Sequence, residues 1–195
     1  MRNSESYYRI EADDKHSANR WFLDEPVAED GEEIDAREFI SAVPYRGPRP
    51  RIVPIDEGGK RVAFNLAAFD MPVVSREVAD AIERLSPGVC EHFPVLIDSH
   101  IDGYEILNVL PACRCVDENR TLIERWTEED GRPDKVGQYR TMLNLTIDPT
   151  RVSGRDIFRV AGWEIALIVS GRLRRDLEQI KRLGLEFVPV TRGYQ

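Results

Sequence analysis

A 22-residue pattern occurs twice in the chain, at residues 74–95 and 169–190, and it constrains the fold more than any other feature. Aligned without a gap, the copies share an opening Val-Ser, apolar residues at the fifth, ninth and twelfth places, Glu at the tenth and eighteenth, and a closing Pro-Val. Apolar residues three and four places apart predict an amphipathic helix with one buried face. The chain should therefore build the same helix-and-strand unit twice.

The ends of each unit are also predicted by residue type. Ser75 and Ser170 precede the apolar periodicity and fit as N-caps, because a serine oxygen can accept a hydrogen bond from an unpaired amide of the first helical turn. Gly88 and Gly184 end the helical regions, and a short apolar strand follows each glycine. These two units indicate the architecture of the fold and do not indicate a catalytic or binding function.

The length of 195 residues predicts a single domain that can bury a real core. Residues 1–55 are a candidate N-terminal lobe, which the proline-rich segment 44–54 would connect to a main body of residues 56–195. No apolar run reaches the roughly 18–20 residues of a membrane span, and the N-terminus has no signal-like apolar core. We expect a cytoplasmic protein without membrane contact. Three cysteines do not form a disulfide framework.

The negative charge is concentrated near the N-terminus. Residues 11–38 contain eleven carboxylates and three cations, a net charge of −8, so the other 167 residues are formally neutral. Such a field repels nucleic acid and would steer a basic protein partner, such as a nuclease, onto the segment. The alternative is a solvated acidic loop that only aids solubility. The candidate partner-binding residues are Asp24, Glu25, Glu29, Asp30, Glu32, Glu33 and Asp35.

The rest of the chain consists mainly of short apolar or alternating segments that predict strands. Two hairpins are expected, one joining residues 52–55 to 61–66 across Gly58-Gly59 and one joining 112–117 to 121–126. The predicted fold class is α+β: a mixed, mainly antiparallel sheet with two Ser-capped helices packed on it and an irregular acidic N-terminal region.

Two groups of residues could carry chemistry. Cys90, His92, Cys113 and Cys115 have an alternating spacing that would place two ligands on each of two strands, but the two-residue gap of zinc knuckles is missing. His100 lies between two aspartates and could be a tuned acid or base, but turn hydrogen bonding explains that cluster better. A small metal-binding protein or enzyme is therefore the alternative function, and we expect no metal and no cofactor.

The ordered set of short motifs resembles the eleventh family of immunity proteins from bacterial polymorphic toxin systems, over nearly the whole chain. The residues that carry the resemblance are Trp21, Asp30-Gly31, Phe39, Val73-Val74-Ser75, Ile106-Leu107-Asn108-Val109-Leu110, Asp117, Thr121, Ile157-Phe158-Arg159 and the closing strand at residues 184–189. The resemblance implies an antidote, not an enzyme, that binds a cognate toxin domain.

No catalytic residues are carried over from that family. Asp117 and Thr121 are interpreted as a structural turn pair whose carboxylate and hydroxyl bond to nearby amides. Arg159, which follows an apolar pair, is expected to pair with a carboxylate at a sheet edge. Asn108 lies in a strand predicted to be buried, so its amide needs partners for both donor and acceptor. A plain scaffold or regulatory module is the third class considered.

Overall fold

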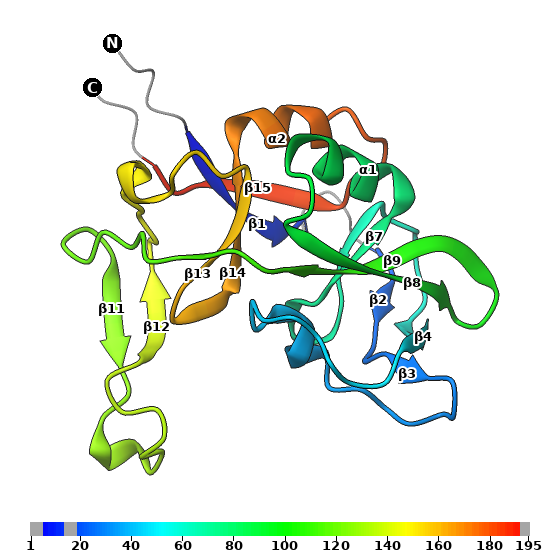
Figure 1. Ribbon diagram of the computed structural model, residues 1–195, viewed down its shortest axis with the longest axis horizontal. Coiled ribbons are helices and arrows are strands. Elements are labelled where there is room, and N and C mark those ends of the chain that lie inside the picture. Colours follow the sequence, from blue (N-terminus) through cyan, green and yellow to red (C-terminus); the bar gives the residue numbers. More distant parts are fainter. Residues whose placement is uncertain (1–5, 14–18, 192–195) are drawn as a thin grey trace.

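The computed structural model describes residues 6–13 and 19–191. The fold is α+β with mixed, mostly antiparallel sheets and two α-helices, α1 (Arg76–Leu85) and α2 (Gly171–Leu177). Figure 1 shows the two helices side by side above the sheets, and residues of α1 contact residues of α2. Neither helix in the described part of the chain combines the length and the apolar character that a membrane crossing needs.

The strands form two large sheets rather than the single sheet expected from the sequence. The six-stranded sheet has the order β3 (Val27–Ala28), β4 (Pro50–Val53), β8 (Cys90–Ile97), β9 (Ile101–Val109), β7 (Pro72–Ser75), β6 (Phe64–Leu66). The five-stranded sheet has the order β10 (Ala112–Cys113), β13 (Ile157–Val160), β14 (Trp163–Ser170), β1 (Tyr7–Ala12), β15 (Leu185–Pro189). Only the β4–β8 and β10–β13 pairs are parallel in these two sheets.

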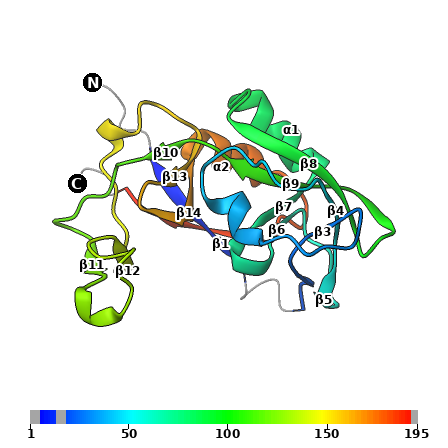
Figure 2. The same cartoon turned by 60° about the horizontal axis from the view of Figure 1, so that its bottom comes forward.

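Two short sheets complete the described structure. One pairs β2 (Phe22–Leu23) with β5 (Ile55–Glu57). The other pairs β11 (Leu122–Arg125) with β12 (Tyr139–Leu143), and together with the connecting residues 126–138 we call it the arm. Figures 1 and 2 both show the arm at one end of the molecule and β3 at the other. Four short 3₁₀ helices, including η1 (Ala36–Ile40), lie between strands.

The 22-residue repeat is a repeat of structure. In the first copy β7 and β8 both pair antiparallel with β9, and in the second copy β14 and β15 both pair antiparallel with β1. The register is also equivalent. Tyr104 of β9 lies opposite Ser75 and Val95, while Tyr7 of β1 lies opposite Ser170 and its carbonyl accepts a hydrogen bond from Val190 N (3.0 Å). Each copy is therefore a strand–helix–strand unit whose two parallel strands enclose a third, antiparallel strand.

Three hydrophobic clusters arise from the alternation of side chains along these strands. The first joins α1 and α2 to the facing sides of both large sheets. The second covers the other face of the six-stranded sheet with residues 21–45, and the third covers the other face of the five-stranded sheet with residues from 113–152. Neighbouring residues in one strand enter different clusters, as Val73 and Val74 do, because strand side chains point alternately to opposite faces.

The two predicted N-caps differ. Ser170 lies at the start of α2, and its hydroxyl accepts from Leu173 N (3.2 Å) and donates to the buried carboxylate of Asp156. Ser75 lies at the N-cap position of α1, but its buried hydroxyl has no hydrogen-bond partner among residues 6–13 and 19–191. The expectation of a side-chain cap at Ser75 is therefore wrong, although the backbone there is extended as the cap position requires.

Both predicted hairpins are wrong as well. Residues 55–57 pair with β2, and β6 pairs with β7, so no ladder joins 52–55 to 61–66. The turn at residues 117–121 exists, but the strand before it pairs with β13 and the strand after it pairs with β12. The proline-rich segment also contains a strand, β4, which lies between β3 and β8.

Candidate protein-binding surfaces

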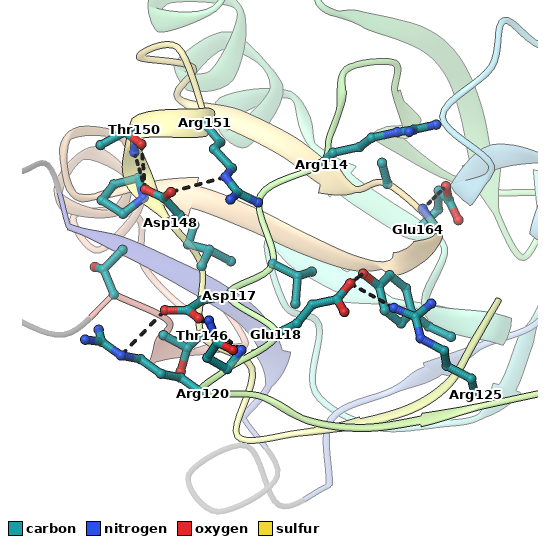
Figure 3. Close-up of a pocket in the computed structure, with 18 of the residues that line it drawn as sticks. Arg114, Asp117, Glu118, Arg120, Arg125, Thr146, Asp148, Thr150, Arg151 and Glu164 are labelled. Atoms are coloured by element: carbon teal, nitrogen blue, oxygen red, sulfur yellow. Dashed lines mark hydrogen bonds and ion pairs between the residues drawn. The ribbon is translucent and has the colours of Figure 1, made fainter. Parts of the chain in front are cut away.

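A groove of about 1790 Å³ lies between the arm and the five-stranded sheet (Figure 3). Its lining comes from segments that are far apart in the sequence: residues 114–120, the arm, residues 146–151 and residues 161–164. Ser6 and Thr191, next to the first and last strands, also line it. This groove has walls of mixed charge, with four arginines and four carboxylates among the lining residues, which are Arg114, Arg120, Arg125, Arg151, Asp117, Glu118, Asp148 and Glu164.

The turn at Asp117 forms part of the groove wall. The Asp117 carbonyl accepts from Arg120 N (3.1 Å) and Thr121 N (3.0 Å), and its carboxylate accepts from Asn119 N (3.2 Å). Thr121 Oγ1 donates to the Thr146 carbonyl (3.2 Å) and accepts from Thr146 N (3.0 Å). Asp117 and Thr121 therefore connect the turn before β11 to the segment that follows β12.

The arm has an apolar face that no other described element covers. Leu122 and Leu143 lie opposite each other on β11 and β12, with 63% and 58% of their surfaces exposed. The opposite face packs Met142 and Ile123 into the third hydrophobic cluster. Near the tip, the Trp126 ring contacts Lys135 and Arg140 at 5.4 and 4.9 Å from the ring centroid. The arm is therefore anchored on one side and open on the other.

The predicted partner-binding carboxylates lie on a loop with a fixed backbone. Ala28 N donates to Glu32 O (2.8 Å) and Ile34 N to Pro26 O (2.8 Å), while the side chains of Ala28 and Ile34 are buried in the second cluster. Asp24, Glu29, Asp30, Glu32 and Glu33 are exposed, and Glu25 and Asp35 are half-buried. Residues 14–18, which also belong to the acidic segment, lie outside the described residues.

Carboxylates lie close together in this loop, and one of them, Asp35, forms an ion pair with Arg37. Burial, followed by a hydrogen bond with Glu33, raises the pKa of the Glu25 carboxyl, and the nearby negative charges of Glu33 and Asp35 raise it further. Asp35 is balanced: its hydrogen bond from Arg37 (Nε to Oδ1, 2.8 Å) lowers the pKa of Asp35. The loop therefore holds a concentration of negative charge in a defined shape.

Asn108 and Arg159 are fully buried, and both link distant segments. Asn108 Nδ2 donates to Val43 O (2.8 Å) and Glu91 Oε2 (3.0 Å), whereas its Oδ1 has no partner among the described residues. Arg159 Nη1 donates to Glu164 O (2.8 Å) and Nη2 to Phe39 O (3.5 Å).

The expectation that Arg159 pairs with a carboxylate is wrong. Of the residues that the structure describes, none places a carboxylate within ion-pair distance of its guanidinium, and two backbone carbonyls take that role. Burial lowers the pKa of Arg159 to about 10, which leaves the side chain charged at neutral pH. Arg159 thus carries a buried positive charge between β13 and η1.

The residues of the alternative metal site are not brought together. Cys90 lies in the first hydrophobic cluster and Cys113 and Cys115 lie in the third. His92 lies between Glu105 (Nδ1 to Oε1, 3.2 Å) and Glu83 (Nε2 to Oε2, 3.5 Å). Within the described ranges, no three His, Cys, Asp or Glu side chains are grouped so that they could hold a metal ion.

The cysteines and His100 have no geometry suited to catalysis. Burial raises the pKa of Cys90 and of Cys115 to about 12, so both are neutral thiols and poor nucleophiles. His100 lies in the exposed turn between β8 and β9, where Nδ1 contacts the Asp98 carbonyl at 2.6 Å. The alternative of a metal-binding protein or an enzyme built on these residues is therefore not supported by their positions.

Sequence reasoning found the acidic loop but missed the groove. The groove arginines are spread over residues 114–151 with no regular spacing, and only the folded chain brings them to one cavity. In the sequence, the spacing of Asp117 and Thr121 predicted a turn, and this turn forms part of the groove wall.

Comparison with known proteins points to a family. A sequence model of the Immunity protein family (Imm11) matches residues 11–192. A search of curated proteins finds no match to the chain.

Proposed function

Because the chain belongs to the Immunity protein family (Imm11), we propose that it protects cells by binding a cognate toxin domain in a stoichiometric complex, without catalysis. The family match carries this proposal, since it covers residues 11–192 and so includes both helices and both large sheets apart from the first four residues of β1. The buried, neutral cysteine thiols and the separation of the candidate metal ligands support a binding function over an enzymatic one.

The acidic loop is the proposed contact surface for a basic face of the toxin. Five of its seven candidate carboxylates are exposed, and the buried apolar residues beside them hold the loop in place. A surface that is already ordered loses little conformational entropy on binding. Its field would also accelerate the encounter with a basic partner, because opposite charges steer association over a Debye length of about 8–10 Å at physiological salt.

Reversing the charge of three exposed residues in this loop, Glu29→Lys, Glu32→Lys and Glu33→Lys, is expected to reduce the association rate with the toxin domain by about tenfold or more at low salt. The dissociation rate should change less, because exposed charges act mainly on encounter. Surface plasmon resonance at several salt concentrations, with the toxin domain encoded beside this protein as the ligand, measures both rates.

The matched control reverses three exposed carboxylates outside the acidic loop and the arm, Glu77→Lys, Asp80→Lys and Asp102→Lys, with the same change in net charge. If both triple variants associate equally fast, the effect belongs to net charge and the acidic loop is not the contact surface. An association rate of the wild-type protein that does not vary with salt would likewise exclude the loop as the contact surface.

A further inference from the structure

The carboxylates of the groove already have donors within the protein. Asp148 accepts from Thr150 N (3.0 Å) and Thr150 Oγ1 (2.7 Å) and contacts Arg151 (Nε to Oδ2, 3.2 Å). Glu118 Oε1 accepts from Tyr139 Oη (2.6 Å) and Arg125 Nη2 (2.8 Å).

The other two carboxylates are similarly occupied. Asp117 accepts from Asn119 N and contacts Arg120, and Glu164 accepts from Gly162 N (2.7 Å). Hydrogen bonds also lower the pKa of Asp148 and of Glu118, with those from Thr150 and from Tyr139 as the respective main causes. The acidic side chains of the groove are therefore largely satisfied.

The arginines, in contrast, keep most of their donors free. A guanidinium has five N–H donors. Within the described residues Arg120 and Arg151 each use Nε for one contact with a carboxylate, and Arg114 has no hydrogen-bond or ion-pair partner. Among the four groove arginines, and counting partners in the described part of the chain, only Arg125 uses both terminal nitrogens, for Glu118 and the Gly137 carbonyl. The unused hydrogen-bonding capacity of the groove consists mainly of cationic donors.

We propose that this groove binds an extended acidic segment of the cognate toxin. Arginine favours carboxylates because its planar fork of donors matches two carboxylate oxygens. The volume of about 1790 Å³ exceeds the roughly 300–1,000 Å³ of small-molecule pockets, so a length of polypeptide fits it better than a single small anion. The assignment of the toxin as the source of this segment depends on the proposed function.

A peptide also suits the groove better than nucleic acid does. Three carboxylates of the wall lie beside arginines as ion pairs, and a phosphodiester backbone, which carries only acceptors, offers no donor to their remaining lone pairs. A peptide offers backbone N–H groups to these carboxylates as well as acidic side chains to the arginines. Since the arm and β3 lie at opposite ends of the molecule (Figures 1 and 2), the groove and the acidic loop would contact different parts of the toxin.

The first experiment uses the full chain and a fluorescent decaglutamate peptide, with binding followed by fluorescence anisotropy. The variant Arg114→Gln, Arg120→Gln, Arg151→Gln is expected to bind decaglutamate about tenfold or more weakly than wild type. The control Arg49→Gln, Arg76→Gln, Arg175→Gln removes three exposed arginines outside the groove and should stay within about twofold of wild type. Equal binding by both variants, no binding by wild type, or tighter binding of a uridine decamer would overturn the proposal.

The second experiment repeats these variants with the toxin domain encoded beside this protein. A wild-type protein that binds the toxin, together with a groove variant weakened about tenfold or more, supports the proposal. A groove variant that binds the toxin as tightly as wild type overturns it and leaves the proposed function intact. Failure of the wild-type protein to bind the toxin contradicts the proposed function itself. Thermal melting followed by circular dichroism shows that the variants compared are folded.

Discussion

Replacing Arg159 by alanine is expected to lower the free energy of unfolding by about 3–5 kcal/mol, because three losses coincide. The side chain is fully buried, so truncation leaves a cavity between β13 and η1. The Glu164 carbonyl loses a donor at 2.8 Å, and the Phe39 carbonyl loses its weaker contact at 3.5 Å. Denaturation in urea, followed by circular dichroism, measures the change.

The variant Arg159→Met separates packing from charge. Methionine restores much of the volume and removes a buried charge that has no carboxylate partner among the described residues, so it should cost about 1–3 kcal/mol less than alanine. If alanine costs under about 1 kcal/mol, the guanidinium does not hold β13 and η1 together. If methionine costs as much as alanine, the loss of the hydrogen bonds outweighs the cavity.

Replacing Gly184 by alanine is expected to destabilise the protein by about 3 kcal/mol or more. Its φ is +85°, and an added Cβ would lie 2.6 Å from Val62 Cβ and 3.0 Å from the Phe64 carbonyl oxygen. The neighbouring backbone cannot easily move away, since Phe64 N donates to Leu183 O (2.9 Å) and Asp13 N donates to Gly184 O (3.1 Å). Denaturation by urea again gives the magnitude.

Gly88 is the matched control, because it follows the first helix with a φ of +70° and has open space where a Cβ would lie. Gly88→Ala should cost only the left-handed backbone strain of about 1–2 kcal/mol. Equal losses of stability at Gly88 and Gly184 would mean that the added Cβ at Gly184 makes no costly clash with Val62 and Phe64.

The sequence repeat predicted the two units well but could not predict how their strands pair. Equal spacing of apolar residues and the two serines located both helices, and the structure has a helix and a following strand in each copy. The strand enclosed by each unit comes from outside it, from β9 after the first copy and from β1 before the second. A local pattern contains no information about such pairing, which is decided by burial in the whole fold.

The failed hairpin at Gly58-Gly59 has a specific physical cause. A Cβ at Gly59 would lie 2.4 Å from the Asn19 carbonyl oxygen, and Lys60 N donates to that oxygen (2.6 Å). The glycine thus permits close approach of residues 19–21 rather than a tight turn between neighbouring strands. Glycine signals both situations, and the sequence does not distinguish them.

The two candidate surfaces differed in how visible they were in the sequence. The acidic loop is a continuous run of charge, so composition alone located it. The groove depends on the folding of residues 114–151 around the edge of the five-stranded sheet, and its excess of free arginine donors is apparent only after each carboxylate has been matched with its partners. Arginines and carboxylates are mixed along this part of the chain, so the sequence alone does not reveal an excess of free arginine donors.

The most direct test of toxin neutralisation is a titration of the activity of the cognate toxin domain with this protein, together with the mass of the mixture from light scattering. Stoichiometric binding predicts that activity falls in proportion to the added protein and reaches its minimum at a fixed ratio of the two chains, where a complex of matching mass is found. Full toxin activity in excess protein, or loss of activity at far less than one equivalent with no complex, would contradict neutralisation by binding.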